Sequence, residues 1–438
     1  MSSKSETLSI SKLQAKSTAS IAGRVLSIRT LGKICFLTLE DFTGQIQVVL
    51  SQPELIETAQ SMAPQSIVQV EGEVLQIPQP QQPQQLELQA HSLELIQKVT
   101  ATPPIQLESP TVKEKLETLL EHRAISLRHK KIKPIFQIQA AIVQYYREFM
   151  LEFGCTEIFT PLMLASSSEG GSEIFEIEYF DKKATLAQSA QLYKQVMVGV
   201  FDRVFGLSKC FRAENSNTRR HTTEATQFEF EIGYIKDFSD VMQAQQECLR
   251  YILEKLYRTH KSQLEILGAR QLMLPKGDFP CLTFDQACQL LEKQFQIQTQ
   301  GWDDLSTEAE RLLCEYARQQ HGSDFIFVRN FKKAAFYAYK DEQGTYHNVD
   351  LLCKEMEISS GGRRIDSHSQ LEAAIREAGM DPKDFQEYLS IFQFGMPPHG
   401  GFGMGLERLT MLICDVANIR EATLFPSDPT TVASQKLA

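Results

Sequence analysis

The sequence predicts an α+β protein, in which a small β-barrel precedes a larger antiparallel sheet flanked by helices. Three observations support this fold class. Residues 20–97 consist of short strand-like segments separated by turns, with only one helical stretch. Residues 203–234 form two strand-like arms around a polar loop. Amphipathic helical patterns occupy much of the remainder, for example at 138–151 and 241–267.

Composition narrows the class of protein. The chain has 438 residues, of which 42% are hydrophobic and 23% are charged, as expected for a globular protein with a sizeable core. The net charge of −10 disfavours nonspecific nucleic-acid binding, although a local basic face can still bind RNA. No apolar run approaches the ~20 residues of a membrane span, and the N-terminus has no apolar signal core. The nine cysteines are odd in number and scattered, which argues against disulfides or a zinc site. We therefore expect a cytoplasmic protein that does not bind a membrane.

The barrel is predicted from five strand-like segments near the N-terminus. They cover residues 20–28, 33–41, 45–50, 66–77 and 85–96, and the helical stretch covers 54–62. Five strands with one interposed helix suit a closed barrel of the OB type. The stretch 78–83 (PQPQQP) is expected to be an extended loop between two strands.

Composition also suggests the domain borders. We expect the barrel domain in residues 1–100, a hinge or linker in 101–130 and the larger domain in 131–438. Residues 98–115 are rich in Pro, Thr and Ser, as linkers often are. The basic cluster at 128–133 is either a solvated helix end or a hinge that faces RNA.

Helix signals divide the larger domain. The amphipathic helix over 138–151 should end at Phe153 and Gly154. Thr307 with Glu310, and Ser367 with Gln370, have the spacing of capping boxes at helix starts. The region between 241 and 320 is expected to pack outside the sheet and to carry no chemistry.

The segment 203–234 carries the clearest signs of chemistry. Its second arm alternates Phe228, Phe230, Ile232 and Tyr234 with Glu229, Glu231 and Gly233, a pattern typical of a half-buried strand. On the first arm Arg212 and Glu214 should share one face, and the tip carries Arg219, Arg220 and His221. A guanidinium on a rigid strand suits an oligophosphate, because its planar fork binds phosphate oxygens bidentately. An ordinary surface hairpin with an Arg–Glu pair is the alternative.

Two further segments suggest ligand binding. Asp350 and Glu357 could lie side by side if the chain turns at Lys354 and Glu355, and paired carboxylates can hold Mg²⁺. Gly400, Gly401, Gly403 and Gly405 would let a strand approach a ligand closely. Arg408 follows on the next helix.

Three segments together resemble a known family. Residues 211–231, FRAEN…RH..E.TQFEFE, resemble motif 2 of the class II aminoacyl-tRNA synthetases, and residues 401–429 resemble motif 3. The helix at 138–151 with the following segment and Pro161 resembles motif 1, which builds the dimer interface in that class. The resemblance covers residues 20–429 and is greatest to the aspartyl enzymes of the archaeal and eukaryotic type. It implies a homodimer, with the barrel binding the tRNA anticodon.

The resemblance implies an amino-acid pocket. Residues 188–195 resemble the aspartyl signature QSxQLxKQ, so Ser189 and Gln191 would line the pocket and Lys194 would face the substrate carboxylate. Arg364 matches the arginine that reads the aspartate side chain, and Glu169 matches the carboxylate that holds the substrate ammonium. A doubly cationic pocket would favour a carboxylate over a neutral amide, because an unpaired desolvated charge is costly.

The resemblance also implies a nucleotide site and an anticodon site. Arg212 and Arg408 would be the catalytic residues that stabilise the phosphates of ATP, and Asp350 and Glu357 would hold Mg²⁺. ATP would further contact Glu214, His221 and Glu357. Phe36 would stack on an anticodon base and Gln47 would hydrogen-bond one; a barrel-core role for Phe36 is the alternative. The implied reaction is ATP-dependent formation of aspartyl-adenylate, followed by transfer of aspartate to tRNA.

Four positions depart from the usual family pattern, namely Arg24, Glu40, Ala225 and Ser427. Loss of an aromatic ring at Ala225 should weaken ATP binding by ~1 kcal/mol, and Glu40 should weaken phosphate contacts. Three alternatives stay open: an aspartate-adenylating enzyme with another acceptor, a tRNA-binding protein without catalysis, and an enzyme that charges both tRNA-Asp and tRNA-Asn.

Overall fold

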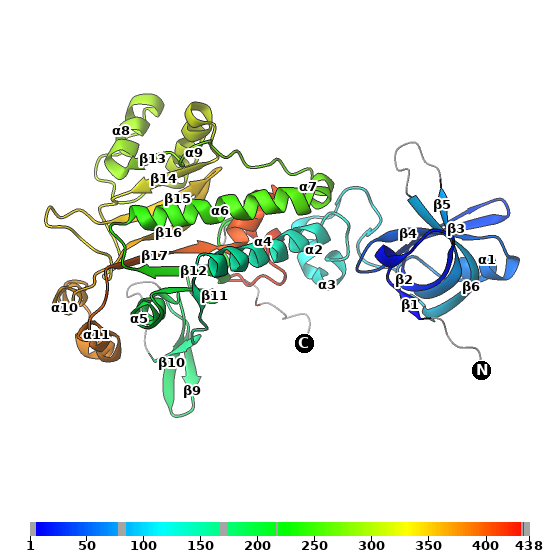
Figure 1. Cartoon of the computed structure of the whole chain (residues 1–438), viewed down its shortest axis with the longest axis horizontal. Coiled ribbons are helices and arrows are strands. Elements are labelled where there is room, and N and C mark those ends of the chain that lie inside the picture. The colour runs from blue at the N-terminus through cyan, green and yellow to red at the C-terminus, as the bar shows by residue number, and fades with distance from the viewer. Residues whose placement is uncertain (1–5, 78–84, 166–172, 216–217, 431, 433–438) are drawn as a thin grey trace. The chain divides into compact units, whose positions relative to one another are not determined.

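The computed structural model describes residues 6–77, 85–165, 173–215, 218–430 and 432 (Figure 1). The chain falls into two units, Met1–Lys113 and Glu114–Ala438. The border between them lies within the range 101–130 that we expect for the linker. None of the described helices is long and apolar enough to cross a membrane.

The first unit is the predicted barrel. Its strands are β1 (Thr7–Leu8), β2 (Ser17–Leu31), β3 (Ile34–Glu40), β4 (Gln45–Leu50), β5 (Ile67–Ile77) and β6 (Gln85–Gln97). The strand order is β1-β2-β3-β4-β6-β5, and pairing of β2 with β5 closes the barrel. Helix α1 (Pro53–Gln60) lies between β4 and β5, and the short helix η1 (Ile10–Lys12) follows β1. The five long strands and one helix confirm the OB-type prediction; β1 is an addition to it. The loop at 78–83 lies outside the described residues.

Strict alternation along β3 separates the barrel core from its outer face. Cys35, Leu37 and Leu39 are fully buried, whereas Phe36 and Thr38 are partly exposed. Because successive side chains point to opposite faces of a strand, Phe36 lies on the outer face and does not belong to the barrel core.

The second unit is built on a sheet that has eight strands among the described residues. Its order is β13 (Cys281–Thr283), β14 (Phe325–Arg329), β15 (Asn348–Cys353), β16 (Met356–Arg363), β17 (His399–Gly405), β12 (Glu224–Gly233), β11 (Arg203–Phe211) and β7 (Thr156–Glu157). The central pairs are antiparallel as predicted, but β13–β14 and β7–β11 are parallel. The sheet is therefore mixed. Its two edge strands, β13 and β7, are short and are joined to the sheet by long connections. Such connections allow a parallel orientation, whereas a short hairpin loop would make the strands antiparallel.

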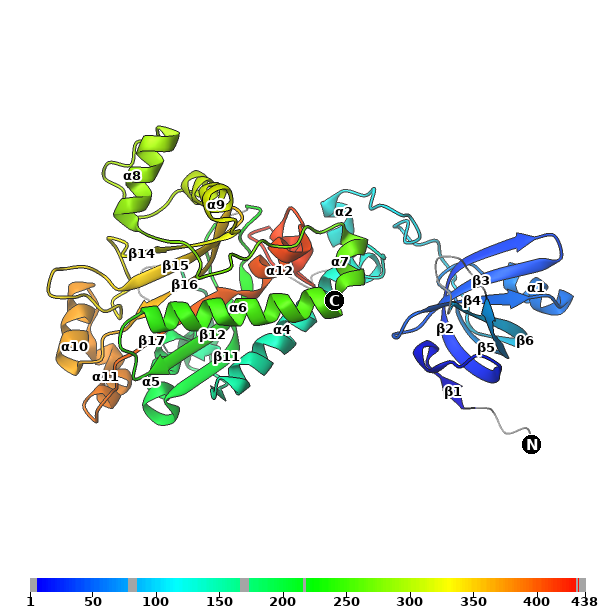
Figure 2. The same ribbon diagram turned by 45° about the horizontal axis from the view of Figure 1, so that its top comes forward.

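Long helices cover one face of this sheet. Helices α4 (Lys133–Glu152) and α6 (Ser239–Thr259) lie side by side across it in both views (Figures 1 and 2). They bury Ile138, Ile142, Tyr146, Leu249 and Ile252 in one core with the sheet and with α12 (Leu406–Cys414). The amphipathic helix predicted at 138–151 is thus confirmed and begins a little earlier than predicted.

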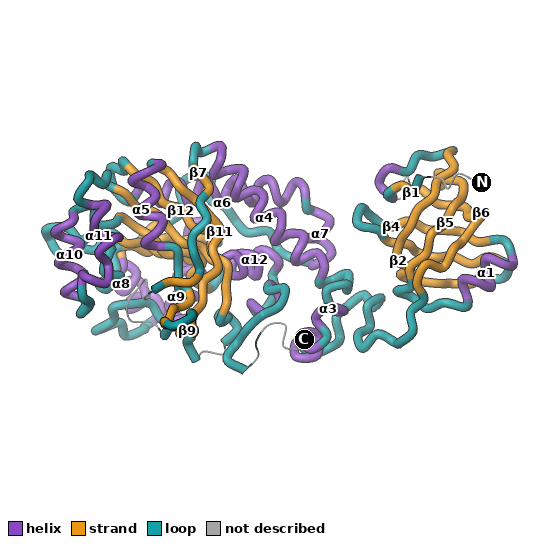
Figure 3. The backbone as a smooth tube through the Cα atoms, turned by 90° about the horizontal axis from the view of Figure 1, so that it is seen from below, coloured by secondary structure: helices purple, strands orange, loops and turns teal. Residues whose placement is uncertain are grey.

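Shorter elements complete the unit (Figure 3). They are α2 (Leu116–Glu121), α3 (Arg123–Ser126), β8 (Met163–Leu164), β9 (Glu176–Tyr179), β10 (Lys182–Leu186), α5 (Gln191–Phe201), α7 (Lys261–Leu267), α8 (Phe284–Phe295), α9 (Thr307–His321), α10 (His368–Glu377), η2 (Pro382–Phe385), α11 (Gln386–Phe392) and η3 (Ile419–Ala422). Helices α8 and α9 pack with β14 in a core of their own.

Both predicted capping boxes are wrong. Helix α9 is capped by Ser306, whose hydroxyl accepts a hydrogen bond from Ala309 N, so Thr307 is already the first helical residue. The carboxylate of Glu310 instead pairs with Arg220. At α10, Ser367 precedes the helix but its side chain makes no cap bond; the hydroxyl lies 3.2 Å from that of Ser369. The cap of α9 thus lies one residue earlier than predicted, and the N-cap residue of α10 is Ser367 as predicted but without the cap bond.

The hairpin forms, but its prediction as half-buried is wrong. Strand β12 is buried on both faces, because Glu229 and Glu231 are only 3% and 0% exposed. Tyr234 lies beyond the end of the strand and is exposed. Strand β11 ends at Phe211, so Arg212 and Glu214 follow it rather than lie on it. Arg212 N still donates to Thr223 O at 2.9 Å, which extends the pairing by one step.

Glycine at 401 allows β17 to pass close to the buried face of β12. Gly401 pairs with Glu231 in the register of the two strands. A Cβ atom at this position would collide with the carbonyl oxygen of Phe230 and with the Glu231 carboxylate. Neither atom can move freely, since one is backbone and the other is held by buried cations. The spacing of β12 and β17 therefore requires glycine here.

We expect Gly401→Ala to lower the free energy of unfolding by about 2–3 kcal/mol, as overpacking of a core does. Urea unfolding followed by circular dichroism measures this. Gly403→Ala is the matched control on the same strand, because its nearest neighbours would lie 3.7 Å from the added Cβ. Equal stability of the two variants would contradict the steric account.

Candidate active site

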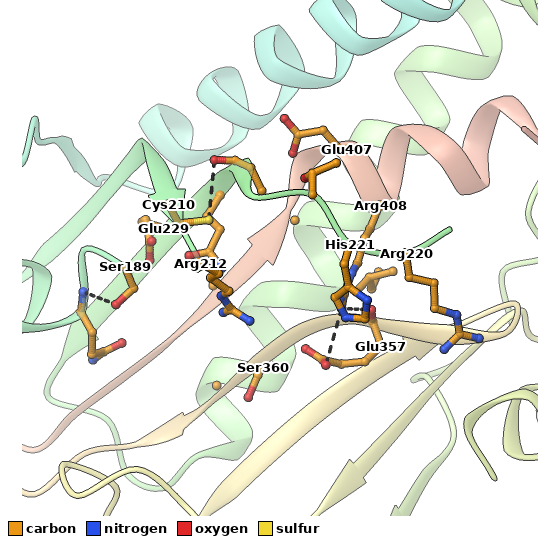
Figure 4. A pocket seen from close by; sticks show the side chains of 18 of the residues that line it. Ser189, Cys210, Arg212, Arg220, His221, Glu229, Glu357, Ser360, Glu407 and Arg408 are labelled. Carbon is orange, nitrogen blue, oxygen red and sulfur yellow. Dashed lines mark hydrogen bonds and ion pairs between the residues drawn. The ribbon is translucent and has the colours of Figure 1, made fainter. Parts of the chain in front are cut away.

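A polar cavity opens on the sheet of the second unit (Figure 4). Strands β11, β12, β16 and β17 contribute to its wall, together with the start of α5, the tip of the β11–β12 hairpin and the start of α12. Its lining includes Ser189, Gln191, Lys194, Arg212, His221, Ala225, Glu229, Glu357, Arg364 and Arg408. The fold thus gathers most of the described candidate residues, from four separate segments, around one cavity.

A buried network of charges forms one end of the cavity. Lys194 Nζ lies 3.0 Å from Glu229 Oε2 and 3.4 Å from Glu231 Oε2. Arg364 Nε donates to Glu231 Oε1 at 2.9 Å, and Arg364 Nη2 donates to the carbonyl of Gly401 at 3.0 Å. Lys194 and Arg364 are 2% and 5% exposed. One carboxylate therefore connects the two cations that the sequence placed in the same pocket.

The expectation of a doubly cationic pocket needs correction. Two carboxylates accompany the two cations, so the formal charges of Lys194, Arg364, Glu229 and Glu231 balance. Burial alone would raise the pKa of Glu231, but Arg364 and Lys194 bring it below its usual value of 4.5. Glu231 is therefore ionised at neutral pH. The cations are preorganised by protein carboxylates before any substrate arrives.

A chain of hydrogen bonds determines how Gln191 faces the cavity. Gln191 Nε2 donates to Gln195 Oε1 at 3.0 Å, and the Tyr388 hydroxyl donates to the same oxygen at 3.0 Å. Gln195 Nε2 lies 3.0 Å from His399 Nε2, and His399 Nδ1 lies 2.9 Å from the carbonyl of Pro397. A carbonyl can only accept, so Nδ1 carries the proton and Nε2 accepts from Gln195. Burial lowers the pKa of His399, which favours this neutral form. Ser189 Oγ accepts from Gln191 N at 3.2 Å.

Cations gather at the other end of the cavity. In Figure 4, Arg212 lies between Ser189 and Glu229 on one side and His221, Arg408 and Glu357 on the other. Arg408 Nη1 donates to the carbonyl of Glu357 at 2.8 Å and lies 3.6 Å from its carboxylate. Burial and the positive charge of Arg408 lower the pKa of His221. This end of the cavity suits a polyanion.

Glu214 is near the same end but does not line the cavity. It is partly exposed, and its charge acts on His221 in the direction opposite to that of Arg408. Glu169 lies outside the described residues.

The carboxylates of Asp350 and Glu357 are carried by neighbouring strands β15 and β16, and the chain turns at Lys354 and Glu355. Burial and the charge of Glu357 raise the pKa of Asp350 well above its usual value. A cation between the two carboxylates would relieve this repulsion. Among the described residues, no group of three or more His, Cys, Asp or Glu side chains converges on one point. This pair fits Mg²⁺, which binds through one or two carboxylates and completes its shell with water and substrate phosphates.

Two positions that depart from the family pattern, Ala225 and Ser427, make contacts that the structure describes. Ala225 lies opposite Cys210 in the β11–β12 register and lines the cavity with it. Glu407, which also lines the cavity, accepts a hydrogen bond from Thr226 N at 2.9 Å. Ser427 uses its backbone, since its carbonyl accepts from Thr223 N at 3.0 Å. That contact to the hairpin loop does not depend on the side chain at 427.

The barrel carries its candidate residues on the outer face. Phe36 is partly exposed, and the guanidinium of Arg29 lies 5.5 Å from the centre of its ring. Gln47 Nε2 donates to Glu87 Oε2 at 2.6 Å. Aromatic, amide and carboxylate groups thus lie on the neighbouring strands β3, β4 and β6.

Sequence reasoning missed Glu87, Glu229, Glu231 and Glu310. The alternation along β12 contained a usable signal, because acidic residues repeat on the face opposite the phenylalanines and the partner strand β17 is rich in glycine. No local signal identified Glu310, because its partner Arg220 is 90 residues away in sequence.

Comparison with known proteins identifies the class. Residues 115–429 match the family model described as tRNA synthetases class II (D, K and N), and residues 19–96 match the OB-fold nucleic acid binding domain. The chain therefore belongs to the class II tRNA synthetases of the D, K and N group.

Individual members of this family are similar to the chain over most of its length. The chain is 39% identical to the aspartate–tRNA(Asp/Asn) ligase of Thermus thermophilus, over 91% of this chain and 93% of that protein. It is 36% identical to the aspartate–tRNA(Asp) ligase of Pyrococcus abyssi, over 93% and 94%. Among solved structures, the asparaginyl-tRNA synthetase of Pyrococcus horikoshii complexed with asparaginyl-adenylate superimposes with a TM-score of 0.89, at 32% identity and covering 98% of this chain and 99% of that one. The aspartyl-tRNA synthetase of Entamoeba histolytica does so with a TM-score of 0.85, at 27% identity, covering 99% and 93%.

Glu231→Gln should lower the free energy of unfolding at pH 7 by about 3 kcal/mol, because it breaks a buried pair and leaves cations uncompensated. Since folding lowers the pKa of Glu231, its stabilisation is present above its usual pKa of 4.5 and is lost as pH falls through the folded-state value. Urea unfolding of both proteins from pH 7 down to pH 3 measures the difference. A difference that stayed constant over this range would argue against the ion pair.

Proposed function

We propose that this chain is an aspartate–tRNA ligase that forms aspartyl-adenylate from aspartate and ATP and then transfers aspartate to tRNA. The observation that carries this proposal is that one cavity contains two adjacent groups of cations. Lys194 and Arg364, joined through Glu231, form the first group, and Arg212 and Arg408, which suit phosphate, form the second. Aspartate as the amino acid is supported by the names of the relatives, which are aspartate–tRNA ligases.

The amino-acid end of the cavity offers a partner for each charge of aspartate. The side-chain carboxylate would meet Lys194 and Arg364, as an anion between two preorganised cations. The ammonium would meet acceptors, for which Glu229 and the Gln191 carbonyl are available in the lining. An asparagine amide would bring no charge to the cations, and sites built on such complementarity can discriminate by ~10⁴-fold.

The nucleotide end would stabilise charge that develops on phosphate. The aspartate α-carboxylate attacks the α-phosphorus, the bond to the bridging oxygen breaks, and pyrophosphate leaves. Arg212 is placed near the junction of the two ends and would stabilise the α-phosphoryl oxygens, while Arg408 and His221 would hold the leaving phosphates. The contribution of the protein is positioning and electrostatic stabilisation, with no covalent enzyme intermediate.

Asp350 and Glu357 would hold Mg²⁺, which supplies charge neutralisation and orientation of the phosphates when it is bound. Glu357 already accepts a contact from Arg408, so one side chain would link the metal and the phosphate-binding cation.

The barrel would bind the anticodon of tRNA. Phe36 would stack on one base, which is worth ~1–3 kcal/mol, and Gln47 with Glu87 would hydrogen-bond another. Charging of tRNA-Asn in addition to tRNA-Asp is a second activity to test, because relatives at similar identity carry both the Asp and the Asp/Asn names. The cysteines are free thiols, which fits work in the reducing cytoplasm.

The decisive experiment is charging of purified tRNA-Asp and tRNA-Asn with labelled aspartate and asparagine, alongside aspartate-dependent ATP–pyrophosphate exchange. We expect exchange and charging with aspartate only. Exchange without charging of either tRNA would favour an adenylating enzyme that uses another acceptor.

Arg364→Leu should reduce aspartate activation by at least about 10³-fold, because it removes the carboxylate-binding guanidinium and leaves Glu231 poorly compensated. Steady-state pyrophosphate exchange measures this. Arg363→Leu is the neighbouring control, since its guanidinium pairs with Asp366 outside the network. Near-normal activity of Arg364→Leu would refute the pocket assignment.

We further propose a homodimer formed around α4 and the segment that follows it. Leu151, Phe159 and Met163 expose large apolar side chains there, with Phe159 85% exposed. A second copy that covered these side chains would remove their apolar surface from water.

Phe159→Asp should weaken this dimer, because it would bury a carboxylate in the interface. Sedimentation velocity over a concentration series should then show the mass of one chain where the parent protein has twice that mass. Phe42→Asp is the control, since Phe42 is equally exposed on the barrel unit. A monomeric parent protein would contradict the proposal.

A further inference from the structure

The loop at the tip of the β11–β12 hairpin is fixed by other parts of the second unit. Arg219 O accepts from Ile419 N at 2.9 Å, and Thr223 N donates to Ser427 O. Arg219 Nη2 also lies 3.1 Å from Glu355 Oε2, at the β15–β16 turn. The described part of this loop, which carries His221 into the cavity, is thus held at both ends by backbone contacts and on one side by an ion pair.

Arg220 is the most buried side chain of this loop, with 8% of its surface exposed. Its Nη1 donates to Glu310 Oε2 at 2.8 Å, and its Nη2 donates to the carbonyl of Glu355 at 2.6 Å. Its Nε is buried and has no hydrogen-bond partner among the described residues, although Arg220 lines the cavity. A buried donor without a partner is costly, so the free edge of this guanidinium is suited to an anionic oxygen of a ligand.

Glu310 comes from α9, in the region that the sequence suggested was packing alone. Its side chain is 16% exposed and lines the cavity adjoining the nucleotide end, together with Asp350 and Glu357. It is the only carboxylate that pairs with Arg220 among the described residues. The Glu310 carboxylate and the Glu355 carbonyl each accept one N–H from a different terminal nitrogen of Arg220, and a planar guanidinium held at two points cannot rotate.

We propose that Glu310 is a positioning residue for nucleotide binding, which acts by orienting Arg220 so that Arg220 Nε faces an anionic oxygen of the triphosphate. Glu310 itself does not touch the nucleotide. The proposal rests on the proposed function for the identity of ATP as the ligand. The physical basis of this role is preorganisation, because an arginine that is already held in the binding geometry loses little conformational freedom when the phosphate binds.

A purely structural role for Glu310 makes a different prediction. If the ion pair only joined α9 to the hairpin loop, its loss would lower stability and would affect aspartate and ATP alike. A positioning role affects ATP selectively and depends on the presence of Arg220. The experiment therefore compares the two substrates and includes the double variant.

The variants are Glu310→Ala and Glu310→Gln, with Glu315→Ala as the matched control. Glu315 lies on the same helix and pairs with Arg311 at the surface, away from the nucleotide cavity. Binding of Mg-ATP without amino acid is measured by calorimetry, and KM for ATP and for aspartate by pyrophosphate exchange. Thermal melting reports folding.

We expect Glu310→Ala to weaken ATP binding and to raise KM for ATP by about tenfold, as loss of a charged hydrogen bond does, with KM for aspartate changed by less than about twofold. Glu310→Gln keeps an acceptor oxygen and should fall between the parent and Glu310→Ala. Glu315→Ala should match the parent. If Glu310→Ala does not fold, Glu310→Gln decides by the same comparison.

Arg220→Met provides the second half of a double-mutant cycle. Adding Glu310→Ala to Arg220→Met should cause no further loss of ATP affinity. A further loss of full size, unchanged ATP binding by the single variant, or parallel increases in both KM values would each overturn the proposal. Parent protein that binds ATP but shows no aspartate-dependent exchange would instead refute the proposed function and leave the ATP comparison interpretable.

Discussion

The buried charge network around Glu231 is the constraint on which the second unit depends. Removing these charges from water costs several kcal/mol for each ion unless they are paired with good geometry. The pairing requires α5, β12, β17 and the residue after β16 to meet at one point. Gly401 makes that meeting possible, because a larger residue would separate β12 from β17. The register of β12 against β17 and the pairing of the buried charges therefore depend on each other.

The same pairing explains how a cavity with strong cations can remain selective. Unpaired cations would attract any anion, whereas Lys194 and Arg364 are already held at defined positions by Glu229 and Glu231. A ligand gains only if its charges match the places that the network leaves open. The other end of the cavity follows the same rule, with Arg220 held by Glu310 and Arg408 paired with Glu357. Carboxylates therefore hold cations in place at both ends of the cavity.

Local patterns predicted much of the fold, and distant contacts account for what was missed. Alternation identified the barrel strands and the hairpin, and helical spacing identified α4, because each signal lies within a few residues. The candidate residues gathered at the cavity came from four segments that resemble family motifs. Sequence could not show that Glu229 and Glu231 pair with Lys194 and Arg364, since partners up to 133 residues apart meet only after the sheet has formed. The two capping boxes failed for local reasons: Ser306 caps α9 one residue earlier than predicted, and the Ser367 hydroxyl lies beside that of Ser369.

The barrel shows how isolated departures from a family pattern can be complementary. Considered singly, Glu40 places an anion on a surface that should bind RNA, and Arg24 replaces an aromatic residue. In the structure Arg24 lies directly opposite Glu40 in the register of β2 and β3, and Arg24 Nη1 also donates to the carbonyl of Gln65 at 3.1 Å. Opposite charges at facing positions of two antiparallel strands stabilise the pair. The side chains of Arg24 and Glu40 are therefore neutral as a pair, so Arg24 offsets the repulsion of phosphate by Glu40 across the strand, although an arginine at position 40 would make this face more positive.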